Sequence, residues 1–102
     1  MRPVLLGLTL LFCPLAHADN WVQTQVIFQN QPIDFVHAQG RVHLASVCQS
    51  LASLPEPYAR CRRHARAFFQ ARCDALRHSP PQTPEALSEK TLYCQAAREF
   101  RP

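Results

Sequence analysis

The sequence predicts an α+β domain that is mainly helical, with an N-terminal β-hairpin followed by three helices that two disulfides cross-link. Three observations support this fold class. Apolar and polar residues alternate before position 40, apolar residues recur at helical spacing after it, and four cysteines lie within the helical part. The chain has 102 residues, a length that accommodates one small domain behind a targeting segment.

Residues 1–18 have the features of a secretory signal peptide. Arg2 gives a positive start, residues 4–15 are mostly apolar, and Ala16-His17-Ala18 is a small-x-small cleavage motif. We expect cleavage after Ala18, which leaves residues 19–102 as a single small domain cross-linked by disulfides. The apolar run is shorter than the roughly 20 residues that span a bilayer, and no second run follows it. The prediction is a periplasmic or secreted protein without a transmembrane span in its mature chain.

The segment after the cleavage site has the pattern of a β-hairpin. Val22, Thr24, Val26 and Phe28 alternate with neighbours that are mostly glutamine, the period of a half-buried strand. Residues 29–32 are predicted to form the turn, and a second strand follows until Gln39-Gly40. A two-stranded hairpin is only marginally stable alone, so its apolar residues should pack on the helices while one edge stays open. These residues are Trp21, Val26, Phe28, Ile33 and Phe35.

The first predicted helix begins near Arg41. Leu44, Val47, Cys48 and Leu51 recur at i, i+3, i+4 and i+7, the spacing of one buried helix face. The prolines within residues 53–57 should end this helix. Ser53 and Glu56 there form an S-x-x-E pattern that can cap the next helix.

The second and third helices are predicted over about residues 57–78 and 84–100. The second should bury one broad apolar face, and the third should bury some of its apolar residues. Thr83 is a suitable N-cap for the third helix, and Pro84 suits its first position. The residues of these faces are Tyr58, Cys61, Ala65, Phe68, Phe69, Cys73 and Leu76 in the second helix, and Leu87, Leu92, Cys94, Ala96 and Phe100 in the third.

Cleavage of the signal peptide removes Cys13 and leaves four cysteines, Cys48, Cys61, Cys73 and Cys94. An even number in an exported domain of this size indicates two disulfides, each of which stabilises the fold by about 3 kcal/mol. The chain has no C-x-x-C or H-x-x-x-H spacing, so we predict no metal site.

The cysteine pairing follows from the predicted helices. Cys61 and Cys73 lie on one helix about 18 Å apart, too far for a disulfide. In an antiparallel hairpin, residues equidistant from the turn face each other. This geometry predicts Cys48 with Cys61 around the turn at 54–55, and Cys73 with Cys94 around the turn at 83–84. The alternative pairing joins Cys48 to Cys73 and Cys61 to Cys94.

A ridge of arginines on the second helix is the candidate binding surface. Arg62, Arg63, Arg66 and Arg77 fall within about 100° of one another on a helical wheel. Arginine binds carboxylates and phosphates with two parallel hydrogen bonds, so the ridge suits an acidic protein or an anionic surface. The alternative interpretation is an ordinary solvated helix face. The chain as a whole is moderately basic, with a formal charge of +4.

The sequence predicts a non-enzymatic protein without a cofactor. It has two glycines and lacks G-x-S-x-G, H-E-x-x-H and Gly-rich phosphate-loop motifs. The leading hypothesis is an accessory protein that binds another envelope or extracellular protein, as an adaptor, inhibitor or assembly factor, through the ridge or the hairpin edge. The alternative is a binder of an anionic polymer or membrane surface, and the lesser alternative is a metal-binding protein. Nucleic acid is the least favoured partner, because the chain is exported and no aromatic residues are interleaved with the arginines.

Overall fold

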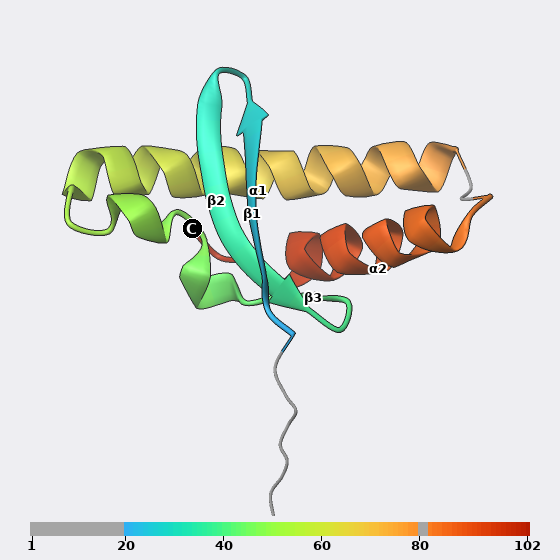
Figure 1. Ribbon diagram of the computed structural model, residues 1–102. Coiled ribbons are helices and arrows are strands. Elements are labelled where there is room, and N and C mark those ends of the chain that lie inside the picture. Colours follow the sequence, from blue (N-terminus) through green and yellow to red (C-terminus); the bar gives the residue numbers. More distant parts are fainter. Residues whose placement is uncertain (1–19, 80–81) are drawn as a thin grey trace, which may run out of the picture.

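The computed structural model describes residues 20–79 and 82–102, so the predicted signal peptide lies outside the described residues. Over the described residues the chain forms three antiparallel strands, in the order β1-β2-β3, and two long helices that run antiparallel (Figure 1). The elements are β1 (Val22–Phe28), β2 (Gln31–Ala38), β3 (Arg41–Val42), α1 (Pro55–His78) and α2 (Pro84–Glu99). The strands cross one side of the helix pair. The fold is therefore α+β, with two helices rather than the three predicted.

The predicted β-hairpin is confirmed. β1 and β2 pair antiparallel, with Val22 opposite His37 and Phe28 opposite Gln31. The turn consists of Gln29 and Asn30 alone, both at positive φ (51° and 66°), as a type I′ turn requires. The turn is shorter than predicted because the residues at 31 and 32 already belong to β2.

The helix predicted to begin near Arg41 is wrong. The chain instead turns at Gln39 and Gly40, forms β3, and continues in two short 3₁₀ turns, Leu44–Ser46 and Gln49–Leu51. The predicted apolar residues do face the core, because a 3₁₀ turn also repeats about every three residues. Val47 is extended and Cys48 is left-handed (φ 65°), so the backbone between the turns cannot be α-helical.

Hydrogen bonds to β2 account for this irregular backbone. The Cys48 N–H donates to the Asp34 carbonyl oxygen at 2.8 Å, and the Val36 N–H donates to Ser46 Oγ at 2.9 Å. The Asp34 carboxylate accepts from the Ser50 N–H at 3.2 Å and from its hydroxyl at 2.6 Å. The segment therefore satisfies its polar groups through hydrogen bonds to the sheet. If it were an α-helix, the groups of β2 named above would lack these partners.

The start of α1 also differs from the prediction. It begins at Pro55 after Leu54, and no side chain caps it, so the predicted Ser53–Glu56 capping box is wrong. Proline has no N–H, so prolines in the first turn leave fewer donors to satisfy. The predicted start of α2 is confirmed, because Thr83 Oγ1 accepts from the Ala86 N–H at 3.1 Å.

The predicted cysteine pairing is confirmed. Cys48 bonds Cys61 with 6.0 Å between their Cα atoms, and Cys73 bonds Cys94 with 4.7 Å. The first disulfide joins the irregular segment to α1 and is fully buried. The second joins α1 to α2, as an antiparallel helix pair predicts.

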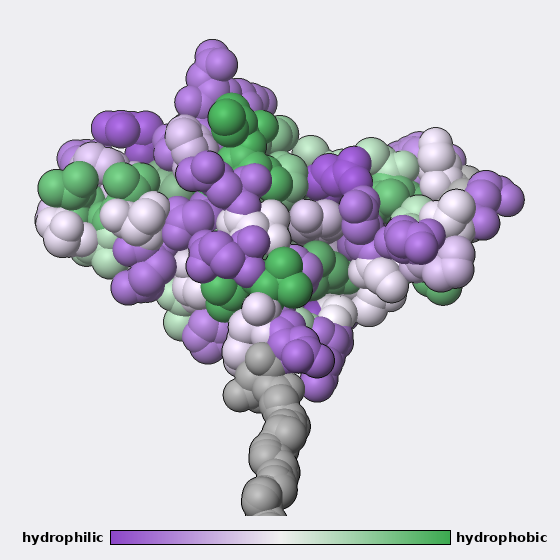
Figure 2. Space-filling model, viewed as in Figure 1, coloured by the Kyte–Doolittle hydropathy of each residue, from purple (hydrophilic) through white to green (hydrophobic). Residues whose placement is uncertain are grey.

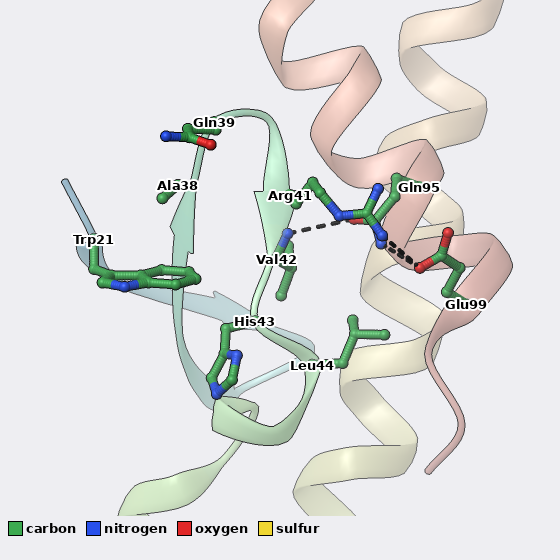
Figure 3. A pocket seen from close by; sticks show the side chains of 9 residues that line it. All are labelled: Trp21, Ala38, Gln39, Arg41, Val42, His43, Leu44, Gln95 and Glu99. Atoms are coloured by element: carbon green, nitrogen blue, oxygen red, sulfur yellow. Dashed lines mark hydrogen bonds and ion pairs between the residues drawn. The ribbon is translucent and has the colours of Figure 1, made fainter. Parts of the chain in front are cut away.

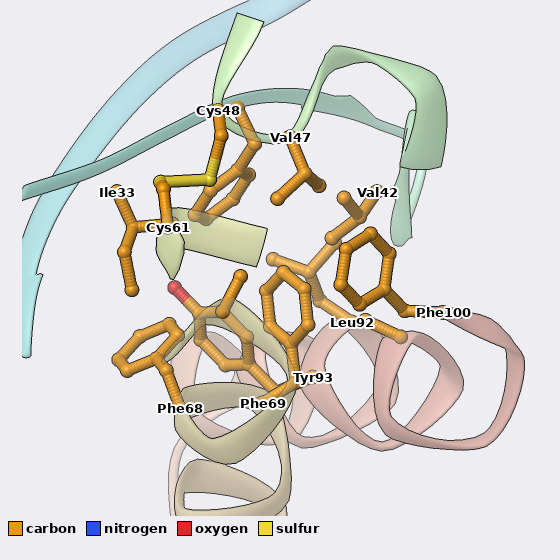
Figure 4. Packing of buried hydrophobic residues seen from close by; sticks show 13 residues of the cluster. Ile33, Val42, Val47, Cys48, Cys61, Phe68, Phe69, Leu92, Tyr93 and Phe100 are labelled. Atoms are coloured by element: carbon orange, nitrogen blue, oxygen red, sulfur yellow. A yellow bond between two sulfur atoms is a disulfide. The ribbon is translucent and has the colours of Figure 1, made fainter. Parts of the chain in front are cut away.

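The core lies between the sheet and the helix pair, and aromatic rings fill its centre (Figure 4). The centroid of the fully buried Phe69 ring lies 5.6 Å from those of Phe35 and Phe100. Tyr93 packs beside Phe69. Burial raises the pKa of the Tyr93 hydroxyl; the negative charge of Glu89 raises this pKa further, and the positive charge of Arg72 lowers it. Because Phe35 comes from β2, Phe69 from α1 and Phe100 from the end of α2, this cluster ties together the sheet and both helices.

Candidate functional site

The four arginines of the predicted ridge have different surroundings. Arg62 donates from Nη1 to the Val47 carbonyl oxygen at 3.2 Å and from Nη2 to the Arg101 carbonyl oxygen at 3.0 Å. Arg66 donates from Nη1 to the Phe100 carbonyl oxygen at 3.2 Å. These two arginines hold the C-terminal segment against α1. Arg63 and Arg77 are exposed, and binding of an anion along the ridge stays a prediction.

Arg62 is expected to contribute to stability. Its guanidinium carbon lies 4.6 Å from the ring centroid of Phe100, in addition to the two hydrogen bonds to carbonyl oxygens. We expect Arg62→Ala to lower the free energy of unfolding by about 2 kcal/mol, because charge-assisted hydrogen bonds and a cation–π contact are lost together. Urea unfolding measures this change. The exposed neighbour is the control, since Arg63→Ala should change stability by less than about 0.5 kcal/mol, and equal losses would contradict the role of Arg62.

Basic residues gather at a second place, beside α2. Two hollows of about 550 and 450 Å³ adjoin there and share Lys90, Cys94 and Arg98. We call the two hollows together the α2 groove. Its remaining lining residues are Gln39, Gly40, Arg41, Leu87, Thr91 and Gln95 on one side, and Gln70, Cys73, Arg77 and Ala97 on the other.

Local structure brings these side chains together. Positions 90, 94 and 98 are four residues apart and lie on one face of α2. The Cys73–Cys94 disulfide places the last turn of α1, with Arg77, against this face. The turn before β3 brings Arg41 to the other end of the groove. Gly40, at φ 76°, lies beside Thr91 there, and a Cβ at this position would be in ordinary contact with the Thr91 methyl group at 3.6 Å.

The α2 groove has a one-sided charge. Of the residues that line it, four are basic, namely Arg41, Arg77, Lys90 and Arg98, and none is acidic. Arg41 pairs with Glu99 at 3.0 Å, whereas the other three make no ion pair within residues 20–79 and 82–102. A concave surface with charges of one sign raises the local concentration of ions of the opposite sign.

A third hollow of about 400 Å³ continues the groove towards the start of β1 (Figure 3). Trp21 and His43 line one side, with their ring centroids 5.4 Å apart. Hydrogen bonds fix the other side. There Gln95 accepts from the Val42 N–H at 3.3 Å and donates to Glu99 at 2.7 Å. Trp21 is half exposed, so its ring is available to a ligand that extends beyond the α2 groove.

The sequence contained a signal for this groove that the ridge hypothesis did not use. Arg77 follows Cys73 by four residues, and Lys90 and Arg98 flank Cys94 by four residues on either side. Four residues are about one helical turn, so the predicted disulfide already implied that these three cations surround one point. Only the position of Arg41 depended on β3, and the sequence pattern did not predict this strand.

No group of three or more His, Cys, Asp or Glu residues that could hold a metal ion occurs in the described part of the chain. No protein-family model, curated protein or solved structure matches the chain.

Proposed function

We propose that this chain is an exported, non-enzymatic accessory protein that binds an extended acidic segment of another envelope or extracellular protein in the α2 groove. The observation that carries the proposal is the lining of that groove, which includes four basic side chains and no acidic one. Adaptors, inhibitors and assembly factors all act by such binding without chemistry of their own.

Two features of the chain support export to the periplasm or the cell exterior. The first is the signal-peptide pattern of residues 1–18. The second is the pair of disulfides, which persist in oxidising compartments and are rare in the cytosol.

The spacing of the cations supports an extended ligand. Lys90 and Arg98 are eight residues apart on α2, which corresponds to about 12 Å along the helix. An extended peptide covers about the same distance in four residues. Carboxylates four residues apart can therefore meet both cations, and Arg77 lines the groove beside them. Cys94 and Ala97 line the groove between these cations.

Fluorescence anisotropy tests this proposal with a short labelled peptide that carries glutamate at every fourth position. We expect Lys90→Gln/Arg98→Gln to weaken binding about 30-fold, because two solvent-accessible ion pairs worth about 1 kcal/mol each are lost. The matched control is Arg60→Gln/Arg63→Gln, which removes the same charge from an exposed part of α1 and should change affinity less than about twofold. A second control is the same peptide with glutamine in place of glutamate, which should not bind.

Two results would contradict the proposal. Equal losses in both double variants would show attraction by net charge rather than recognition in the groove. Stronger binding to vesicles of anionic phospholipid than to the peptide, with both double variants affected alike, would favour the anionic-surface alternative. Binding to such a surface should fall steeply with salt, because exposed charges are screened beyond about 10 Å at 0.1 M.

A further inference from the structure

The outer edge of the sheet carries an inference that is independent of the proposed function. β1 is an edge strand, and all seven of its residues are uncharged. It contains no charged residue and no proline, two of the devices by which natural edge strands avoid pairing with other chains. We propose that β1 pairs antiparallel with β1 of a second copy of this chain, about a two-fold axis at Gln25.

The β1–β2 register determines which peptide groups are free. Phe28 and Gln31 flank a two-residue turn, so they form a hydrogen-bonded pair. Hydrogen-bonded and non-bonded pairs alternate along an antiparallel ladder. The N–H and C=O groups of Gln23, Gln25 and Ile27 therefore point away from β2. The position of Pro32 opposite Ile27 agrees with this assignment, because a non-bonded pair needs no donor from proline.

The free peptide groups are self-complementary. Gln25 is the central residue of Val22–Phe28, and in this register its own N–H and C=O groups point away from β2. An axis at Gln25 therefore pairs all seven residues of both strands, with Gln25 opposite its copy and Gln23 opposite Ile27. Each of the three outward-facing residues can then donate one hydrogen bond and accept one.

Exposed apolar side chains also gain partners in this register. Val22, which is 49% exposed, lies opposite the half-buried Phe28 of the second copy. Ile27 is 72% exposed, and Figure 2 shows apolar side chains gathered at the hairpin end where β1 finishes. The pairing therefore gives Val22 an apolar partner in each copy, whereas Ile27 lies opposite Gln23.

The charge distribution favours this strand over other faces for self-association. Without Arg2 of the predicted signal peptide, the processed chain has 10 basic and 7 acidic residues and a formal charge of +3, so two copies repel each other at long range. β1 contributes no charge to the contact, and cross-strand pairs of like charge are absent from the proposed register. A second copy therefore fits this edge without a complementary charge.

Sedimentation velocity of the processed, exported protein tests the proposal over concentrations up to about 1 mM. A small interface of this kind predicts a monomer–dimer equilibrium with a dissociation constant on the order of 100 μM. Gln25→Lys places two lysines directly opposite each other across the axis, with their Cα atoms about 5.5 Å apart, and repulsion between the like charges should raise this constant about tenfold. The matched control Gln82→Lys adds the same charge at an exposed position elsewhere and should change it less than about twofold. A protein that stays monomeric at every concentration, or equal effects of the two variants, would overturn the proposal.

Amide hydrogen exchange identifies the interface residue by residue. The outward amides of Gln23, Gln25 and Ile27 should exchange more slowly as the concentration rises, while the amides of Thr24 and Val26 are already protected by β2. A dimer in which the three outward amides keep exchanging rapidly would show that another surface forms the contact. Neither measurement involves the α2 groove, so the dimer and the proposed function can fail separately.

Discussion

Reduction of both disulfides is expected to unfold the domain at 37 °C. The two bonds join cysteines separated by 13 and 21 positions. In the chain-entropy description, closing a loop of this length lowers the entropy of the unfolded chain, so each bond raises the free energy of unfolding by about 3 kcal/mol. Their sum of about 6 kcal/mol is comparable with the whole stability of a small domain, about 5 to 10 kcal/mol. The reduced chain should therefore be largely unfolded.

Near-ultraviolet and far-ultraviolet circular dichroism, with and without a reductant, measure this loss. The two bonds can be separated by paired alanine variants. Cys73→Ala/Cys94→Ala should keep a cooperative transition with a stability lower by about 3 kcal/mol. Cys48→Ala/Cys61→Ala should lose more, because both sulfurs are fully buried and their removal also leaves a void. A reduced protein with an unchanged unfolding midpoint would contradict this role of the disulfides.

Phe69→Ala is expected to have the second largest effect. The ring is fully buried, and its centroid lies 5.6 to 6.2 Å from those of Phe35, Phe68, Tyr93 and Phe100. Loss of a buried phenyl ring from such a cluster costs about 3 to 5 kcal/mol, through lost transfer free energy and the cavity that remains. We expect a marked fall in the urea midpoint with the disulfides intact.

The exposed leucine of α2 is the control for Phe69. Leu87 is 56% exposed, so Leu87→Ala should lower the free energy of unfolding by less than about 1 kcal/mol. A loss at Phe69 no larger than the loss at Leu87 would show that the aromatic cluster is not the centre of the core.

The sequence pattern predicted the elements whose conformation depends on residues that are close together in the chain. The alternation at 22–28 predicted β1, because a half-buried strand has a period of two. Thr83 and Pro84 predicted the start of α2 through a side-chain cap and a fixed φ. The disulfides followed from simple geometry, since the chain reverses at 54–55 even without a helix before the turn.

The segment 41–51 could not be predicted in this way. Its apolar spacing fits an α-helix and a pair of 3₁₀ turns equally well. The choice between them depends on bonds to β2, from Cys48 to Asp34 and from Val36 to Ser46, which no local pattern contains.

The candidate site was also predicted only in part, because some of its contacts join residues that are far apart in the sequence. A helical wheel placed Arg62 and Arg66 beside the apolar face of α1 but could not reveal that carbonyl oxygens of the C-terminal segment lie within reach of them. In the α2 groove, the Cys73–Cys94 bond accounts for the positions of Arg77, Lys90 and Arg98, whereas the position of Arg41 depends on β3, which the sequence pattern did not predict.

Backbone ¹H–¹⁵N spectra during titration with the acidic peptide give the most direct test of ligand binding in the α2 groove. We predict that the largest shift changes occur at Lys90, Thr91, Cys94 and Arg98, with a further change at Arg41. Changes centred on Arg60 and Arg63 of α1, or none at saturating peptide, would contradict the assignment of the groove as the binding site.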